Sequence, residues 1–357
     1  MNDAGKNVFR AGRRQARRLD LDKGRVEMSH GAGGRAMSDL IDLLFREAFD
    51  NPLLNQANDQ ARFQVDAGDM VLTTDSFVIS PLFFPGGNIG SLAVHGTVND
   101  LAMGGAEPLY LSAGFILEEG VPLGDLARIV DAMAGAAREA GVQIVTGDTK
   151  VVERGKGDGV FINTAGVGRV LPGVNVSGDL ARPGDSVIVS GTLGDHGVAI
   201  MSQRKGLQFA TALESDSASL NGLVKAMAGV GGEAIRVLRD PTRGGLAATL
   251  NEIAAQSGVG IELKEAAIPL RQEVKGACEL LGLDPLNVAN EGKLIAIVEA
   301  DSAGPILSAM KRHPLGRDAA IVGSVSDDAM QLVRMVTHIG GERVIDWLHG
   351  EQLPRIC

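Results

Sequence analysis

Short apolar strands alternate with amphipathic helices along most of this chain, and this alternation restricts its fold more than any other feature. In the first half, strand patterns occur at residues 71–75, 109–115, 141–145 and 160–170. In the second half they occur at residues 187–189, 259–263, 294–298 and 320–325. Helical patterns lie between them, so we predict two α/β domains. Periodicity alone leaves open whether the sheets are parallel or mixed.

The chain divides into four parts at changes in composition. We predict a disordered basic extension over residues 1–25, a first domain over 26–171, a second over 172–330 and a tail over 331–357. The sequence Leu171-Pro172-Gly173 interrupts the periodic pattern and marks the domain boundary. The clustered arginines Arg13, Arg14, Arg17 and Arg18 also fit nucleic-acid or membrane contact, but a solvated arm is the simpler interpretation.

Composition excludes several classes of function. With 357 residues and 45% apolar residues, the chain can bury two cores. A formal net charge of −10, one Trp and one Tyr argue against a nucleic-acid-binding surface. The two cysteines indicate neither a disulfide framework nor a zinc site. The absence of a membrane-spanning run and of a signal-peptide pattern predicts a cytoplasmic protein.

Three acids border buried elements in the first domain. Asp59 precedes a β-rich segment, Asp75 closes the strand pattern at 71–75, and Asp100 lies in an apolar helix that also contains His95 and Asn99. Asp59 and Asp75 could each cap a turn, and Asp100 could pair with an arginine. Three such acids within a short stretch are better explained as oxygen ligands of Mg²⁺.

Two glycine-containing segments are typical of phosphate sites. Gly31, Gly33 and Gly34 precede a helix, where free backbone amides suit a phosphate. Neither a preceding strand nor a Lys-Ser/Thr ending accompanies them, so they match neither a Rossmann nor a Walker A motif, and a plain turn is the alternative. Residues 146–150 read as a turn that carries Asp148, Thr149 and Lys150, again with a simple hairpin turn as the alternative.

The last residue, Cys357, is an unhindered thiol on a terminal lever. Its own α-carboxylate raises the pKa of the thiol, so reactivity must come from the place where the tail docks. A frayed terminus without a function is the alternative. In the second domain, Asp240 lies where it could cap the next helix.

Six motifs together resemble one family. They are SHGAGG at 29–34, TTDSFV at 73–78, VNDLAMGGA at 98–106, TGDTKV at 146–151, RDPTRGGL at 239–246 and PRIC at 354–357. The chain from about residue 25 onward is similar to the ATP-dependent enzymes typified by aminoimidazole ribonucleotide synthetase and selenophosphate synthetase. Within them it resembles the carbamoyl dehydratases of hydrogenase maturation. The resemblance implies two α/β domains with mixed, α+β-like sheets, a flexible tail and a homodimer with ATP between dimer-related elements.

The resemblance also implies roles for the residues above. Mg²⁺ ions bridging the phosphates of ATP would be held by Asp59, Asp75, Asp100 and Asp240, under a loop formed by Gly31, Gly33 and Gly34. Asp148, Thr149, Lys150 and Asn99 would lie near the γ-phosphate. One departure affects Asp59, because relatives often carry two consecutive acids where this chain has Asn58-Asp59.

The chemistry implied by the resemblance gives Cys357 a purpose. A HypF-like carbamoyltransferase would load a carbamoyl group onto the thiol, and ATP would drive its dehydration to a thiocyanate. Glu291 and His95 are the candidate general bases, and Lys150 would stabilise charge on the transferring phosphoryl group. The resulting cyanide would pass to iron on a HypC–HypD-like scaffold, for a nickel–iron hydrogenase.

Alternatives remain within and beyond this family. Selenophosphate synthetase would want a Cys or selenocysteine in the glycine-rich loop, and residues 30–35 contain neither. Thiamin-phosphate kinase or the purine-pathway synthetase would have no use for Cys357. A non-catalytic ATP-sensing scaffold is the alternative from a different class.

Overall fold

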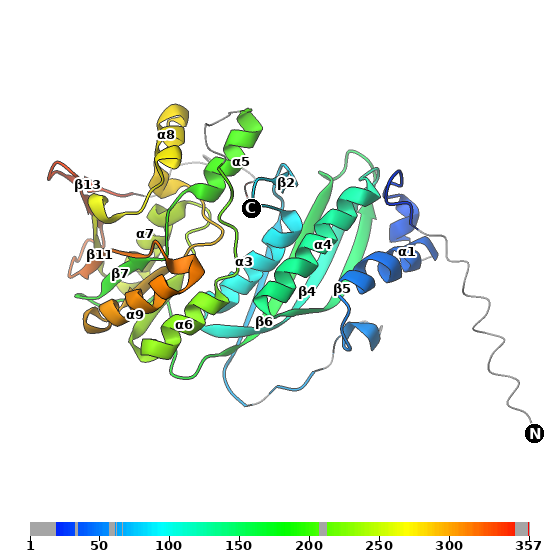
Figure 1. Cartoon of the computed structure of the whole chain (residues 1–357). Coiled ribbons are helices and arrows are strands. Elements are labelled where there is room, and N and C mark those ends of the chain that lie inside the picture. Colours follow the sequence, from blue (N-terminus) through cyan, green and yellow to red (C-terminus); the bar gives the residue numbers. More distant parts are fainter. Residues whose placement is uncertain are drawn as a thin grey trace, which may run out of the picture.

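The computed structural model describes residues 19–32, 35–56, 61, 63–65, 67–206, 213–346 and 356. Most of the basic extension therefore lies outside the described residues, as do Gly33, Gly34, Asp59 and Cys357. Figure 1 shows two α/β halves side by side, each built on its own sheet. No helix in the described ranges has the length and apolarity needed to cross a bilayer.

The first half is a four-stranded mixed sheet in the order β1-β6-β4-β5, in which only β4 and β5 are parallel. Its strands are β1 (Met70–Phe77), β4 (Ala106–Glu118), β5 (Gln143–Val152) and β6 (Val160–Val170), and a small hairpin pairs β2 (Phe83–Phe84) with β3 (Gly87–Asn88). Its helical elements are η2 (Met28–Gly31), α1 (Arg35–Leu40), η3 (Ile41–Phe45), α2 (Arg46–Ala48), η4 (Leu54–Gln56), α3 (Ile89–Met103) and α4 (Leu123–Ala140).

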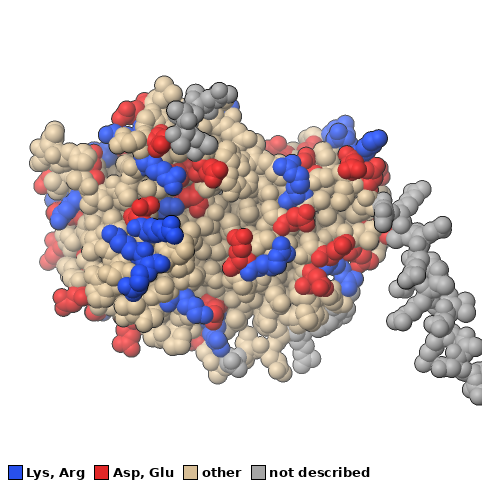
Figure 2. Space-filling view, viewed as in Figure 1, with Lys and Arg blue, Asp and Glu red and all other residues tan. Residues whose placement is uncertain are grey.

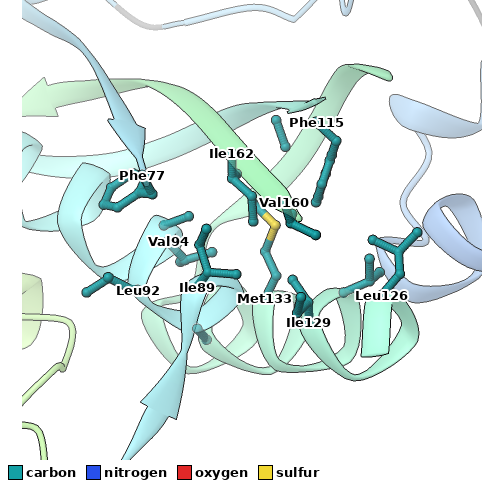
Figure 3. Packing of buried hydrophobic residues seen from close by; sticks show 14 of the residues in the cluster. Phe77, Ile89, Leu92, Val94, Phe115, Leu126, Ile129, Met133, Val160 and Ile162 are labelled. Carbon is teal, nitrogen blue, oxygen red and sulfur yellow. The ribbon is translucent and has the colours of Figure 1, made fainter. Parts of the chain in front are cut away.

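The core of this half lies between the sheet and the helices α3 and α4. Figure 3 shows Ile129 and Met133 of α4 beside the sheet residues Phe115 and Ile162. Strand alternation sends neighbouring side chains to the opposite, open face, where Leu72 is 79% exposed. The helices therefore cover only one face of this sheet.

The second half is a seven-stranded mixed sheet in the order β13-β12-β9-β11-β7-β10-β8. Its strands are β7 (Ser186–Val189), β8 (Ile235–Arg239), β9 (Gly260–Lys264), β10 (Ile295–Val298), β11 (Ala320–Ser326), β12 (Val333–Val336) and β13 (Glu342–Val344). Its α-helices are α5 (Asp195–Lys205), α6 (Asn221–Gly231), α7 (Gly245–Ser257), α8 (Gln272–Leu281) and α9 (Ala300–Arg312). Short turns η5 (Gly232–Ala234), η6 (Glu265–Ala267), η7 (Pro285–Asn287) and η8 (Pro314–Gly316) connect them.

Helices cover both faces of this larger sheet. The central strand β10 is buried throughout: Ile295 and Ile297 belong to a cluster with α7, whereas Ala296 and Val298 belong to a cluster with α6 and α9. A strand buried on both faces reads as a continuous apolar run, which is why the sequence pattern located it well. The two-domain α/β fold with mixed sheets is confirmed.

Three details differ from the sequence analysis. Residues 146–150 are not a turn, because they continue β5 in parallel register with β4. The pattern also missed α6 and β8, and the segment assigned to the tail begins with β12 and β13 at the edge of the larger sheet. Each of these strands depends on pairing with a distant segment, which local periodicity does not register.

Charge on the molecule is mixed in sign. On the face shown in Figure 2, Lys and Arg side chains are interspersed with Asp and Glu.

Candidate active site

A cavity of about 560 Å³ lies between the two halves and is lined by Asp75, Asp100, Asp240 and Arg243. An adjoining hollow shares these four residues and adds Glu291. Three of the four acids predicted to bind metal, and one of the two predicted bases, therefore meet at the domain boundary. The fourth acid, Asp59, lies outside the described residues.

Local structure explains how β1 and α3 bring two of these acids together. Along β1, Thr73, Asp75 and Phe77 share the face that packs against α3. Thr73 Oγ1 donates to Asp100 Oδ2 at 2.9 Å. Gly96, one turn before Asp100, permits this approach, since a Cβ on it would lie 2.8 Å from the Phe77 ring. Asp75 is thus an interior strand residue and does not cap a turn.

Asp240 enters the cavity from the loop between β8 and α7. Helix α7 begins at Gly245 with Gly244 at its N-cap, so Asp240 is not the cap that the sequence allowed. Gly245 has a φ of 60°, and a Cβ on it would lie 2.6 Å from the Leu286 carbonyl oxygen. The glycine pair therefore lets the loop turn closely, which leaves the Asp240 side chain facing the cavity.

The carboxyl groups in this cavity destabilise one another's ionised forms. Burial, and then the charge of Asp240, raises the pKa of Asp100 to about 7, although the Thr73 hydrogen bond opposes the change. Burial is also the main cause that raises the pKa of Asp240 to about 6. Burial raises the pKa of Asp75 as well. Such a cluster is completed by positive charge from a cation or a cationic ligand.

The acids of the cavity fit a Mg²⁺ ion that is bound jointly by protein carboxylates and nucleotide phosphates. Within the described residues, no three His, Cys, Asp or Glu side chains form a ready metal-binding group. Mg²⁺ at nucleotide sites commonly takes only one or two carboxylates, with phosphate and water oxygens completing its shell. Acids whose pKa values are raised by burial, and to a lesser extent by neighbouring carboxylates, suit that partial role.

Glu291 is the most deeply buried acid of the group, with 3% of its surface exposed. Burial, and then the charges of Asp240 and Asp216, raises its pKa well above the ordinary value. Its Oε1 atom is buried and has no hydrogen-bond partner among the residues that the structure describes. The backbone is held firmly, because Glu291 N–H donates to Asp216 Oδ1 at 3.1 Å. A carboxyl group with a raised pKa and a free oxygen is suited to accept a proton.

The two predicted residues on the inner side of α3 are tied to the segment 213–220. His95 is buried, its Nδ1 lies 2.8 Å from Ser217 Oγ, and burial lowers its pKa to about 4. The side-chain amide of Asn99 donates to the carbonyls of Ala218 and Glu291 and accepts from Leu220 N–H. Both side chains therefore join the two halves beside the cavity.

The β5 residues lie apart from the acidic cavity. Asp148 and Lys150 are exposed and form an ion pair at 2.6 Å, and the Lys150 hydrogen bond is the main cause that lowers the pKa of Asp148. Strand alternation places both on the open face of the sheet, whereas Thr149 is buried on the helix face. Gly31 packs beside this strand, since a Cβ on it would lie 2.8 Å from Val151 N. Neither Asp148 nor Lys150 lines the cavity between the halves.

Sequence reasoning missed several residues of this site. Arg243 lines the cavity and its charge opposes the raised pKa of Asp75, and it lies in the RDPTRGGL motif that drew attention only to Asp240. Thr73 could have been found from strand alternation, because it lies two residues before Asp75 on the same face of β1. The segment 213–220 gave no signal beyond polarity.

The chain end reaches the domain boundary. Ile356, the residue before Cys357, is 2% exposed and packs in the hydrophobic cluster of the first half together with Ile200 of α5 and Ala289. Ile200 and Ala289 belong to the second half of the chain, so Ile356 is buried where the two halves meet.

Comparisons with known proteins agree with this architecture. Family models match the N-terminal domain of AIR synthase related proteins at residues 57–170 and the C-terminal domain at residues 182–335. The chain is 65% identical over 340 residues to carbamoyl dehydratase HypE of Azotobacter vinelandii, covering 95% of this chain and 99% of the relative.

Two solved structures are also similar. A crystal structure of the hydrogenase maturation protein HypE in complex with ATP has a TM-score of 0.89 and 53% identity, and covers 92% of this chain and 99% of that chain. A crystal structure of a HypE–HypF complex has a TM-score of 0.77 and 53% identity, and covers 87% of this chain and 99% of that chain.

Proposed function

We propose, from the premise that this chain belongs to the HypE family of AIR synthase related proteins, that it is an ATP-dependent carbamoyl dehydratase acting on its own Cys357. The observation that carries this proposal is the buried, hydrogen-bond-deficient Glu291 in an acidic cavity at the boundary where Ile356 is also buried. This arrangement offers a proton acceptor near a site for cations and phosphates. The residue that precedes the substrate cysteine is buried at the same domain boundary.

In the proposed reaction, the Cys357 sulfur carries a carbamoyl group as a thiocarbamate. The carbamoyl oxygen attacks the γ-phosphorus of ATP, ADP leaves, and one proton leaves the nitrogen. Loss of the second N–H proton then breaks the carbon–oxygen bond, so phosphate departs with that oxygen and a thiocyanate remains on sulfur. Thiocarbamate and ATP thus give thiocyanate, ADP, phosphate and a proton.

Glu291 is the better of the two candidate bases for the nitrogen protons. Burial and neighbouring acids raise its pKa, whereas burial lowers the pKa of His95 to about 4. The conjugate base of the weaker acid is the stronger proton acceptor, and Glu291 also has a free oxygen. His95 instead contacts Ser217, which supports a role in holding the segment 213–220.

Asp75, Asp100 and Asp240 would hold Mg²⁺, which when bound supplies positive charge that neutralises the phosphates of ATP. Asp59 stays a predicted fourth ligand, and Gly31, Gly33 and Gly34 stay the predicted phosphate loop. Arg243 adds a fixed cation to the cavity wall. These groups would stabilise the charge that develops as the phosphoryl group transfers.

Lys150 and Asp148 would act from a second copy of the chain. They lie on the open face of the smaller sheet, which also exposes the apolar side chains of Leu72 and Ile116. We infer that two such faces pair in a homodimer, which brings Lys150 and Asp148 of one copy toward a nucleotide shared with the other, whereas Thr149, on the helix face, stays a predicted nucleotide contact. Burying that apolar surface supports the pairing.

Two partners follow from the chemistry. A HypF-like carbamoyltransferase would load Cys357, which the solved HypE–HypF complex of relatives supports. A HypC–HypD-like iron scaffold would accept the cyanide for nickel–iron hydrogenase maturation.

Intact-protein mass spectrometry tests the proposal directly. The full chain is treated with the carbamoyltransferase and its substrates, and its mass is recorded before and after addition of Mg-ATP, with Cys357→Ala and Cys278→Ala beside the wild type. We expect a carbamoyl adduct that requires Cys357, persists in Cys278→Ala and loses one water after ATP is added. ATP hydrolysis without any adduct on Cys357 would instead indicate a small-molecule substrate.

A further inference from the structure

The tail is held through its backbone as well as through the Ile356 side chain. The carbonyl oxygen of Ile356 lies 2.5 Å from His196 Nε2. That carbonyl belongs to the peptide bond that joins residue 356 to Cys357, so whatever holds it also orients the link to the thiol. A carbonyl oxygen can only accept a hydrogen bond, so Nε2 of His196 is the donor.

The other ring nitrogen of His196 fixes this state. Nδ1 lies 2.7 Å from Ser215 Oγ, and with the proton on Nε2 it accepts the hydroxyl hydrogen of Ser215. The imidazole is fully buried, and burial lowers its pKa and so favours this neutral form. Phe84 of β2 packs against the ring edge to face, with centroids 5.7 Å apart. The ring can therefore neither rotate freely nor titrate easily.

Ser215 is itself anchored to both halves of the molecule. Its N–H donates to the Pro85 carbonyl of the first half at 2.8 Å, and its Oγ accepts from Ser217 N–H at 3.1 Å. The next residue, Asp216, accepts from Glu291 N–H and pairs with Lys293 at 3.1 Å. One short segment thus connects the residue that orients His196 to the residue that positions the proposed base.

We propose that His196 and Ser215 form a tail latch, a pair of positioning residues that holds the Ile356 carbonyl and thereby sets where Cys357 stands relative to Glu291. The proposal rests on the function proposed above for its catalytic consequence, but the latch itself is a property of tail docking. Two consequences follow. Loss of the latch makes the thiol more accessible to reagents, and it slows dehydration of the loaded tail.

The first test measures thiol access and needs neither ATP nor a partner. The rate of Cys357 alkylation by N-ethylmaleimide is followed by intact mass in the full chain. Cys278 serves as the unreactive internal reference, because burial raises the pKa of its thiol to about 11. His196→Phe keeps a ring against Phe84 but removes the donor, and His196→Gln restores an N–H. Ser202→Ala, on the same helix, removes a hydroxyl that donates to Val198 O, its one partner among the described residues, and is the control.

We expect alkylation of Cys357 to become about 2- to 10-fold faster in His196→Phe, the range that loss of one hydrogen bond gives. The rate should return most of the way to wild type in His196→Gln and stay at the wild-type value in Ser202→Ala. An unchanged rate in His196→Phe overturns the latch. Should that variant fail to fold, Ser215→Ala takes its place with an expected increase of about 2- to 5-fold, and an unchanged rate there overturns the latch equally.

The second test separates the latch from the proposed function. With carbamoylated protein and Mg-ATP, His196→Phe should dehydrate the adduct more slowly than wild type by a similar factor, with recovery in His196→Gln. Faster alkylation together with equal dehydration rates would overturn the positioning role. If the wild type itself never forms an adduct on Cys357, the proposed function fails, while faster alkylation in His196→Phe still establishes the latch.

Discussion

Buried carboxylates occupy two regions of this molecule under opposite conditions. In the second half, Asp185 is buried against Arg236, whose Nε lies 3.0 Å away. In the cavity between the halves, Asp100, Asp240 and Glu291 form no salt bridge with any residue that the structure describes, and their pKa values are raised. The chain can therefore neutralise a buried acid when only stability matters. The cavity acids, which have no such ion pair among the described residues, lie where the proposed function places Mg²⁺ and ATP.

The largest expected loss of stability comes from breaking the buried ion pair between Asp185 and Arg236. Arg236→Met leaves Asp185 buried without its cation, and removing one partner of such a pair costs about 3–5 kcal/mol. The free energy of unfolding from urea titration measures this loss, and Arg236→Lys should lose less. Turnover per folded molecule should be unchanged. A loss below about 1 kcal/mol would show that the paired acid is not sustained by Arg236.

A smaller effect should follow pH through His95, which lies beside the cavity and whose Nδ1 contacts the hydroxyl of Ser217. Its pKa in the folded protein is about 4 against 6.5 ordinarily, so the unfolded chain takes up the proton first. Its contribution is complete above pH 6.5 and is lost as pH falls toward 4, by about 3 kcal/mol in total. Unfolding free energy measured from pH 7 to pH 4 should fall less steeply in His95→Asn. Parallel curves for the two proteins would contradict this account.

Removing one negative charge from the acidic cavity should stabilise the protein and inactivate it. Asp100 has a pKa of about 7, so at pH 8 it is ionised in the folded state at an energetic cost. A pKa raised from 3.8 to about 7 corresponds to a cost of about 4 kcal/mol at pH 8. Asp100→Asn removes this cost but weakens the hydrogen bond from Thr73, so the unfolding free energy should rise by about 2 kcal/mol in EDTA without nucleotide. The gain should shrink as pH falls below 7 and vanish near pH ~3, where the folded and unfolded forms are both largely protonated. Dehydration turnover should fall by at least ~100-fold.

Asn at position 100 would sharpen the comparison in a second way. Added Mg-ATP should narrow the stability difference between Asp100→Asn and wild type, since only the wild-type carboxylate gains from the bound cation. An Asp100→Asn protein that is less stable than wild type in EDTA at pH 8 would show that the acid is structurally required.

The smallest effect on stability should come from the exposed pair on β5. Lys150→Met breaks the ion pair with Asp148, and exposed pairs contribute about 0–1 kcal/mol. Turnover should nevertheless fall clearly, because Lys150 is assigned to charge stabilisation across the proposed dimer. Urea titration and the mass-based dehydration assay on the same samples separate the two effects. A stability loss as large as that of Arg236→Met would contradict the surface role.

The sequence located what local pattern and motif encode. Asp75 and Asp100 were found because each borders an apolar run, and β10 was found because it is buried on both faces. Residues 146–150 were read as a turn because glycine and polar residues resemble one, whereas parallel pairing with β4 keeps them extended. The role of Ser215 was beyond reach, because its partners Pro85 and His196 are distant or separated by residues without periodicity.

His196 holds Ile356 through its main-chain carbonyl, and this has a consequence for the group carried on the Cys357 sulfur. A main-chain carbonyl is chemically the same whether the neighbouring sulfur is bare, carbamoylated or converted to thiocyanate. The docking contact therefore cannot distinguish substrate from product, and the same contact can form in every reaction cycle. Discrimination between the carbamoylated and the spent tail must come from residues that contact the group on the Cys357 sulfur. The tail can then pass through repeated reaction cycles without a change at the Ile356 contact.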